Sequence, residues 1–72
     1  MSNTSEHKRF CEREGWELYK QTDHYFYRKQ LDDGTWLYTK VSMGRKEYGT
    51  AMFKQILKKQ LNCDKEYFNS KV

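Results

Sequence analysis

Apolar residues spaced three and four positions apart predict a helix in the C-terminal part of the chain. The pattern covers residues 51–61 and gives a single buried stripe. This stripe consists of Phe53, Ile56, Leu57 and Leu61. Thr50 comes directly before the segment and is expected to cap the helix, because its hydroxyl can accept a bond from a free backbone N–H.

A weaker helical pattern covers residues 5–14, where only two apolar residues share the stripe. Gly15 follows and is expected to end this helix, since glycine readily adopts the left-handed conformation found just past a helix end. In the C-terminal tail, Asp64 can cap one further turn of helix. Tyr67 or Phe68 would then pack back onto the domain.

Alternation of apolar and polar residues predicts three strands between these helices. They cover residues 16–21, 24–31 and 35–41. Asp33-Gly34 separates the last two strands and predicts a tight hairpin, because this pair tolerates the positive φ angles of such turns. In the third strand, Trp36, Tyr38 and Lys40 are expected to share one face.

The predicted order is helix, three strands, helix, with a possible short helix in the C-terminal tail. Three consecutive strands joined by short turns favour an antiparallel sheet. Two amphipathic helices can together cover one face of such a sheet. We therefore predict a single α+β domain over residues 1–72 with the order α-β-β-β-α, which resembles a double-stranded-RNA-binding domain.

The charge of the chain is uneven along its length, although the net charge is only +4. Residues 1–39 contain six basic and seven acidic residues, whereas residues 40–65 contain seven basic and two acidic ones. This excess indicates a basic surface suited to nucleic acid or to an acidic partner. A solvated helix face gives the same pattern, so charge alone leaves both interpretations open.

Several classes of protein find no support in the sequence. The N-terminal segment lacks the apolar core of a secretory signal, and no apolar run approaches the roughly 20 residues that span a membrane. We therefore expect a cytoplasmic protein that makes no membrane contact.

Cys11 and Cys63 fit no metal-ligand spacing and are expected to be free buried thiols. Neither a metal ion nor another cofactor is predicted.

Four short motifs occur along the chain in a recognisable order. They are Gly15-Trp16 after the first helix, His24 at the head of the second strand, the Asp33-Gly34 turn, and Ile56-Leu57-Lys58 in the last long helix. Over roughly residues 5–68, their order and spacing resemble the HicA family of toxins. The resemblance implies the same α-β-β-β-α fold. It also implies a small ribonuclease that cleaves messenger RNA and is neutralised by a HicB-like antitoxin protein.

The sequence departs from the family pattern at two places. The family histidine follows Gly-Ser, whereas His24 follows Thr22-Asp23. Many family members also have a proline and a second histidine after the third strand, where residues 40–44 of this chain read KVSMG. These departures leave the implied fold unchanged. Asp23 adds a negative charge where RNA phosphate would approach, or its carboxylate orients the imidazole.

The resemblance makes His24 the candidate catalytic residue. RNA is cleaved without a metal when its 2′-hydroxyl attacks the neighbouring phosphate, a step that needs a base and an acid. A histidine side chain, with an ordinary pKa of about 6.5, can serve in either role at neutral pH. A basic side chain would stabilise charge on the phosphate. The candidates for this RNA-binding role are Lys20, Arg28, Lys40, Arg45 and Lys46.

Two other interpretations of the sequence stay open. The same fold could bind RNA without cleaving it, or it could act only as a protein-interaction domain. Unpaired bases could stack on aromatic side chains, although several of these are expected in the core. The aromatic candidates are Tyr19, Tyr25, Tyr27, Trp36 and Tyr38. His7 has no such role and is expected on the surface.

Overall fold

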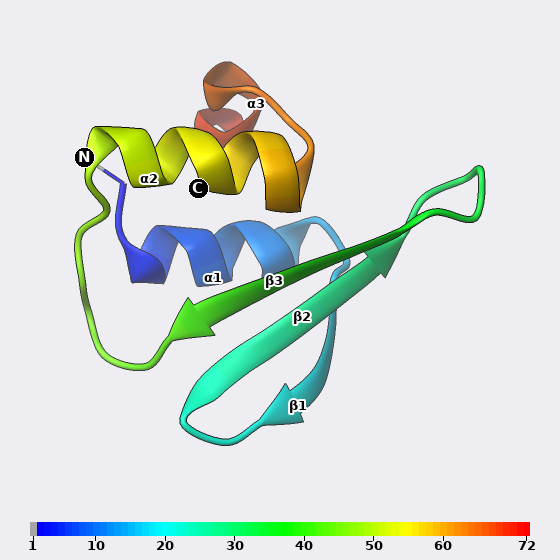
Figure 1. Cartoon of the computed structure of the whole chain (residues 1–72), viewed down its shortest axis with the longest axis horizontal. Helices are drawn as coiled ribbons and strands as arrows, with labels where there is room; N and C mark the ends of the chain where they lie inside the picture. Colours follow the sequence, from blue (N-terminus) through cyan, green and yellow to red (C-terminus); the bar gives the residue numbers. More distant parts are fainter. Residues whose placement is uncertain (1) are drawn as a thin grey trace.

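The computed structural model describes residues 2–72 and confirms the predicted order of elements (Figure 1). The elements are α1 (Thr4–Arg13), β1 (Glu17–Gln21), β2 (His24–Gln30), β3 (Trp36–Ser42), α2 (Thr50–Gln55), η1 (Ile56–Leu61) and α3 (Lys65–Ser70). α2 and η1 are consecutive, and together they form the predicted helix over residues 51–61. The η1 part has the wider turn of a π-helix. α3 is the short helix predicted in the C-terminal tail.

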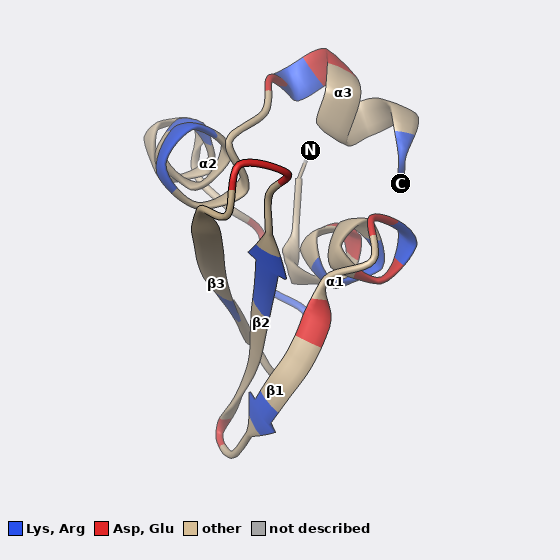
Figure 2. Ribbon diagram, turned by 90° about the vertical axis from the view of Figure 1, so that its right-hand side faces the viewer, with Lys and Arg blue, Asp and Glu red and all other residues tan. Residues whose placement is uncertain are grey.

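The three strands form one antiparallel sheet in the order β1-β2-β3. Tyr27 of β2 pairs with Thr39 of β3, and Tyr25 pairs with Val41. These four residues belong to the face that packs against the helices, where Tyr27, Thr39 and Val41 are buried. The helices gather on this same side of the sheet (Figures 1 and 2). The α+β arrangement predicted from the sequence is therefore the observed one.

The core lies between this face and the helices, and three phenylalanine rings meet in it. The Phe68 ring stacks on the Phe10 ring with 5.0 Å between centroids and meets the Phe53 ring edge-on at 5.1 Å. Phe68 is 0% exposed, so it anchors α3 in the core of the domain. The remaining core residues are Cys11, Trp16, Tyr27, Val41, Ile56, Leu57 and Leu61.

The residues that start helices and turns largely follow the sequence prediction. The Asp64 side chain caps α3 by accepting a hydrogen bond of 2.7 Å from the Tyr67 backbone N–H. Gly34 has a φ of +91°, as the hairpin requires. The prediction that Thr50 caps the following helix is wrong. The helix begins one residue earlier, so Gly49 is the extended residue at the cap position and Thr50 is the first helical residue.

His7 is buried, contrary to the prediction that it lies on the surface. Its side chain is 0% exposed and lies between α1, β3 and the loop before α2. Nδ1 is 2.7 Å from the Tyr48 hydroxyl, and Nε2 is 2.9 Å from the Thr39 hydroxyl oxygen. Thr39 in turn donates to Gln60 Oε1 at 2.6 Å. Burial is tolerated because both ring nitrogens have hydrogen-bond partners.

These bonds define one proton arrangement for His7. Because the Thr39 hydroxyl donates its proton to Gln60, Nε2 of His7 must donate to the Thr39 oxygen. Nδ1 then accepts from the Tyr48 hydroxyl, and the imidazole is neutral. Burial lowers the pKa of His7 to about 4, in agreement with a neutral ring. The network ties α1, β3, η1 and the loop before α2 together.

Stability is expected to depend on pH because His7 resists protonation in the folded protein. Its folded pKa of about 4 is below the ordinary value of about 6.5, so the unfolded chain takes up a proton that the folded state excludes. The free energy of unfolding should be fully retained above about pH 6.5. It should decrease by about 3 kcal/mol as the pH falls to about 4. Urea unfolding followed by circular dichroism at several pH values measures this change.

The variant His7→Gln serves as the control for this pH dependence. Glutamine fits a polar site but cannot take up the proton, so most of the dependence should disappear in this interval. If the wild type and the variant lost stability in parallel between about pH 6.5 and 4, His7 would not be the cause of the pH dependence.

Candidate functional site

The face of the sheet that points away from the helices carries most of the predicted site residues. Cross-strand partners lie on the same face, so the pairing defines the members of this surface, which we call the open face. Its members are Glu17, Tyr19 and Lys20 of β1, His24, Phe26, Arg28 and Gln30 of β2, and Trp36, Tyr38, Lys40 and Ser42 of β3. In Figure 2, basic residues appear on each of the three strands.

His24 is the first residue of β2 and lies at one end of the open face, opposite Ser42. Its side chain is 27% exposed, so a ligand on this face can contact the ring. Nδ1 lies 3.2 Å from Asp23 Oδ1, and the same oxygen accepts a bond of 3.0 Å from the Thr22 hydroxyl. The hydrogen bonds from His24 and then Thr22 lower the pKa of Asp23, which keeps its carboxylate ionised. Asp23 therefore holds Nδ1, and Nε2 is the nitrogen that can exchange a proton with a ligand.

Lys20 and Lys40 flank His24 on the two neighbouring strands. Both pair with Phe26, Lys20 from β1 and Lys40 from β3. Phe26 is two residues from His24, so each lysine is a diagonal neighbour of His24 on the open face. Such neighbours are separated by roughly 7–8 Å, which long side chains can span. The Lys20 ammonium nitrogen lies 5.3 Å from the centre of the Phe26 ring. A phosphate group beside His24 would thus be within reach of two ammonium groups.

A β-bulge in β1 brings Lys20 to the open face. Strict alternation would place Glu17 and Tyr19 on this face and turn Lys20 towards the helices. The pairing register instead shifts between Leu18 and Lys20, so Lys20 pairs directly with Phe26. The Tyr19 ring also stays on the open face, 6.3 Å from the Phe26 ring. One inserted residue therefore adds a cation to the surface around His24.

Arg28 lies further along the open face, two residues beyond Phe26 on β2. Its Nε donates to Glu17 Oε1 at 2.7 Å, and this bond raises the pKa of Arg28. The guanidinium carbon lies 5.0 Å from the centre of the Tyr19 ring and 5.1 Å from that of the Trp36 ring. Arg28 is therefore a cation held between aromatic rings, not an immediate neighbour of His24.

Arg45 and Lys46 do not lie on the open face. They belong to the loop after β3, which runs back to the start of α1. The Thr4 N–H donates to the Lys46 carbonyl at 2.8 Å, and the Lys46 N–H donates to the Thr4 hydroxyl at 3.0 Å. Arg45 lines a surface hollow together with Tyr25, on the helix side of the sheet. Of the five basic candidates, the structure gathers Lys20, Arg28 and Lys40 on the face of His24.

The aromatic candidates divide between the two faces of the sheet. Tyr27 is buried, and Tyr25 packs against the core, so neither can stack with a base on the open face. Alternation along β2 explains this, because both residues are odd-numbered and the open-face residues of β2 are even-numbered. Phe26 is the open-face ring that the sequence prediction omitted. The other aromatic residues on the open face are Tyr19, Trp36 and Tyr38.

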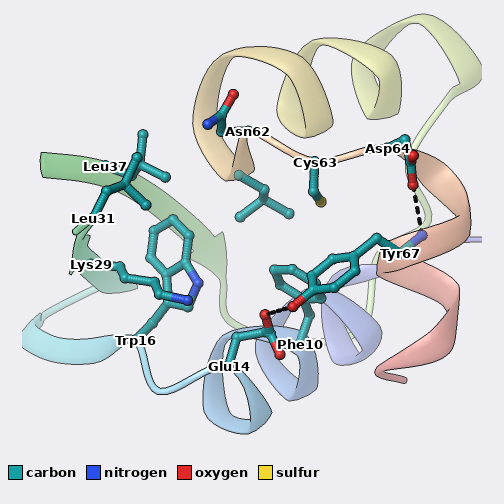
Figure 3. Close-up of a pocket in the computed structure, with 11 residues that line it drawn as sticks. Phe10, Glu14, Trp16, Lys29, Leu31, Leu37, Asn62, Cys63, Asp64 and Tyr67 are labelled. Atoms are coloured by element: carbon teal, nitrogen blue, oxygen red, sulfur yellow. Dashed lines mark hydrogen bonds between the residues drawn. The ribbon is translucent and has the colours of Figure 1, made fainter. Parts of the chain in front are cut away.

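A cavity of about 400 Å³ lies apart from this site, between the end of α1, the strand hairpin and the connection from η1 to α3 (Figure 3). Its wall includes Trp16 and Cys63, and a hydrogen bond from the Tyr67 hydroxyl to Glu14 crosses its α1 side. The residues that line the cavity include neither His24 nor any of the five basic candidates. The cavity is therefore separate from the open face.

The two cysteine thiols are free, as predicted, but differ in exposure. Cys11 is buried and Cys63 is only partly buried, contrary to the expectation for Cys63. Burial raises the pKa of Cys11 to about 12 and that of Cys63 to about 11, so both stay protonated at neutral pH.

Within residues 2–72, no three His, Cys, Asp or Glu side chains gather as metal ligands. None of the helices in this range is long and apolar enough to cross a membrane.

Comparisons with protein-family models, with curated proteins and with solved structures found no match to this chain. The fold itself defines a small α+β domain whose sheet is covered by helices on one face only. The residues of the open face, above all His24 and its neighbours, are therefore the guide to function.

Proposed function

We propose that this protein is a HicA-like toxin, a small ribonuclease that cleaves messenger RNA without a metal ion and uses His24 as a general acid–base. The arrangement of Lys20, His24 and Lys40 is the observation that carries this proposal. A partly exposed imidazole lies at one end of the open face, and two lysines are its diagonal neighbours on the adjacent strands. An imidazole can accept and donate a proton, and the lysines can hold the phosphate on which negative charge develops.

The proposed step needs only the RNA and side chains of the open face. Nε2 of His24 removes the proton of a 2′-hydroxyl, and that oxygen attacks the adjacent phosphorus. The bond from phosphorus to the 5′-oxygen breaks, and the His24 imidazolium returns the proton to that oxygen, leaving a 2′,3′-cyclic phosphate on one fragment and a 5′-hydroxyl on the other. Lys20 and Lys40 stabilise the phosphate oxygens. Asp23 acts as a positioning residue, because its bond to Nδ1 fixes the orientation of the ring.

The resemblance in sequence also supports a protein partner, a HicB-like antitoxin. Such a partner would inhibit cleavage by covering His24 and the lysines beside it. It would thereby exclude RNA from the same surface, without any change in the fold.

The proposed chemistry makes cleavage dependent on the 2′-hydroxyl and independent of metal ions. The purified protein is expected to cut a single-stranded RNA in the presence of excess EDTA. It should leave intact the same oligonucleotide with 2′-deoxy sugars, which lack the attacking group. Gel analysis of end-labelled oligonucleotides measures both results, and the control is the same RNA without protein. Cleavage of the deoxy oligonucleotide, or cleavage abolished by EDTA, would contradict this mechanism.

A second candidate function is an RNA-binding domain that does not cleave, and Asp23 favours it. Its carboxylate is ionised and lies 3.2 Å from the His24 ring, where it opposes the approach of a phosphate. In the same experiment, this alternative gives intact RNA together with binding that weakens as salt rises from about 50 to 200 mM. Binding that does not change with salt would count against both functions.

A further inference from the structure

The open face exposes aromatic rings that the cleavage step itself does not use. Trp36 is 43% exposed, Tyr38 is 52% exposed and Tyr19 is 39% exposed. Large aromatic side chains bury much apolar surface when they find a partner, so several exposed on one surface indicate a binding site. All three lie on the open face. Trp36 is at the end of β2 that is remote from His24, Tyr38 is opposite Arg28, and Tyr19 is near the middle of the sheet, beside Phe26.

These rings form a platform with a cation inside it. The Trp36 and Tyr38 rings are nearly parallel, at 28°, with centroids 6.5 Å apart. The Tyr19 ring meets the Tyr38 ring edge-on at 6.0 Å. The Arg28 guanidinium lies about equally far from the Tyr19 and Trp36 rings, at 5.0 and 5.1 Å, and Glu17 holds it in place. A ligand that fits this platform has flat rings to stack and negative charge beside them.

The platform continues into the site of the proposed cleavage. Trp36 pairs with Gln30, and Ser42 pairs with His24, so the two ends are six residues apart along β2. At about 3.3 Å per residue, this separation is roughly 20 Å. Lys20 and Lys40 lie between the two ends, beside Phe26. Stacking groups, cations and the imidazole thus follow one line on the sheet.

We infer that the open face binds single-stranded RNA, with unpaired bases stacked on Trp36 and Tyr38 and the sugar-phosphate backbone directed along β2 to His24. The inference rests on the proposed function and specifies its substrate class. In a duplex the bases are stacked on one another and unavailable, whereas unpaired bases can stack on aromatic side chains. The fold resembles a double-stranded-RNA-binding domain, but this surface is suited to the other form of RNA.

Charge favours RNA over a protein as the occupant of this surface. Lys20, Arg28 and Lys40 are interleaved with the rings, and lysine is depleted in the cores of protein interfaces. The acidic residues at the open face are both engaged, since Glu17 bonds Arg28 and Asp23 lies against His24. The cations therefore lie where a polyanion with flat bases would place its phosphates.

The test measures binding of a single-stranded RNA and of a duplex of the same sequence, both with 2′-O-methyl sugars so that neither is cleaved. The single strand should bind more tightly than the duplex. Trp36→Ala should weaken single-strand binding roughly 5- to 150-fold, the range expected for one lost stacking contact. Trp36→Phe should retain most of the affinity, because phenylalanine keeps an aromatic face. Met52→Ala, which removes an exposed apolar side chain from α2, is the matched control and should bind normally.

Tryptophan fluorescence provides a readout that does not depend on affinity. Trp36 is exposed and Trp16 is buried, so saturating single-stranded RNA should quench the fluorescence of the wild type and of Trp16→Phe. Quenching should be lost in Trp36→Phe. If quenching persists in Trp36→Phe, or Trp36→Ala binds the single strand as the wild type does, the inference is overturned. The inference is also overturned if the duplex binds more tightly than the single strand.

The failure of this inference can be distinguished from the failure of the proposed function. If Trp36→Ala bound RNA with wild-type affinity and cleaved it normally, the stacking inference would be wrong, whereas the proposed cleavage at His24 would be unaffected. A protein that binds neither form of RNA would overturn both. If Trp36→Ala instead abolished only the capture of a purified protein partner, the surface would be a protein interface and the inference would be wrong.

Discussion

Replacing His24 with alanine is expected to slow RNA cleavage by about 10²–10⁴-fold, the contribution typical of a positioned general acid–base. Alanine removes the only imidazole on the open face and leaves the flanking lysines in place. Binding should therefore change little, because the proposed phosphate contacts of Lys20 and Lys40 would remain. The measurement is the single-turnover rate of cleavage of a labelled RNA, with the dissociation constant determined separately on an uncleavable 2′-O-methyl strand.

A control variant on the same strand shows whether the effect belongs to the imidazole. Gln30 lies on the open face at the other end of β2, so Gln30→Ala tests the loss of a polar side chain away from the proposed chemistry. It should cleave at close to the wild-type rate. If His24→Ala binds RNA normally and also cleaves at the wild-type rate, His24 is not the acid–base group and the proposed mechanism fails.

Replacing Phe68 with alanine is expected to reduce the free energy of unfolding by about 3–5 kcal/mol. The ring is 0% exposed and packs against Phe10 and Phe53, so its removal leaves a cavity between α1, α2 and α3. A domain of this length has a total stability of roughly 4–11 kcal/mol. The substitution therefore removes a large part of the stability, and urea unfolding followed by circular dichroism measures the loss.

The neighbouring substitution Asn69→Ala is the matched control for α3. Asn69 is exposed on the same short helix, so its replacement should change stability by no more than about 0.5 kcal/mol. A Phe68→Ala variant as stable as Asn69→Ala would mean that α3 does not contribute to the core in solution. The role assigned to the C-terminal tail would then be wrong.

The architecture could be predicted from the sequence because local patterns agree with the tertiary structure. The apolar stripe of residues 51–61, the Asp33-Gly34 turn and the alternation in residues 35–41 are each determined by neighbours in the chain. Each of these patterns is found in the structure. The face that carries Trp36 and Lys40 could also be predicted, since alternation within one strand fixes it.

The details that could not be predicted depend on contacts between distant segments. His7 lies on the same helical stripe as Phe10, so its position pointed inward. Its burial depends on hydroxyl groups of Tyr48 and Thr39, which are more than 30 residues away. The bulge beside Leu18 had no clear signal in the sequence either, and it decides that Lys20 joins His24 on the open face. Register shifts of this kind are set by pairing with the next strand.

The stack of Phe68 on Phe10 also affects when the protein can fold during translation. A ribosome adds roughly 5–20 residues per second, so about 3–12 s separate the synthesis of these two residues. Until Phe68 has been added, the nascent chain lacks the ring that packs against Phe10 and Phe53 in the core. The core of a chain that is still being translated is therefore incomplete until its last residues have been added.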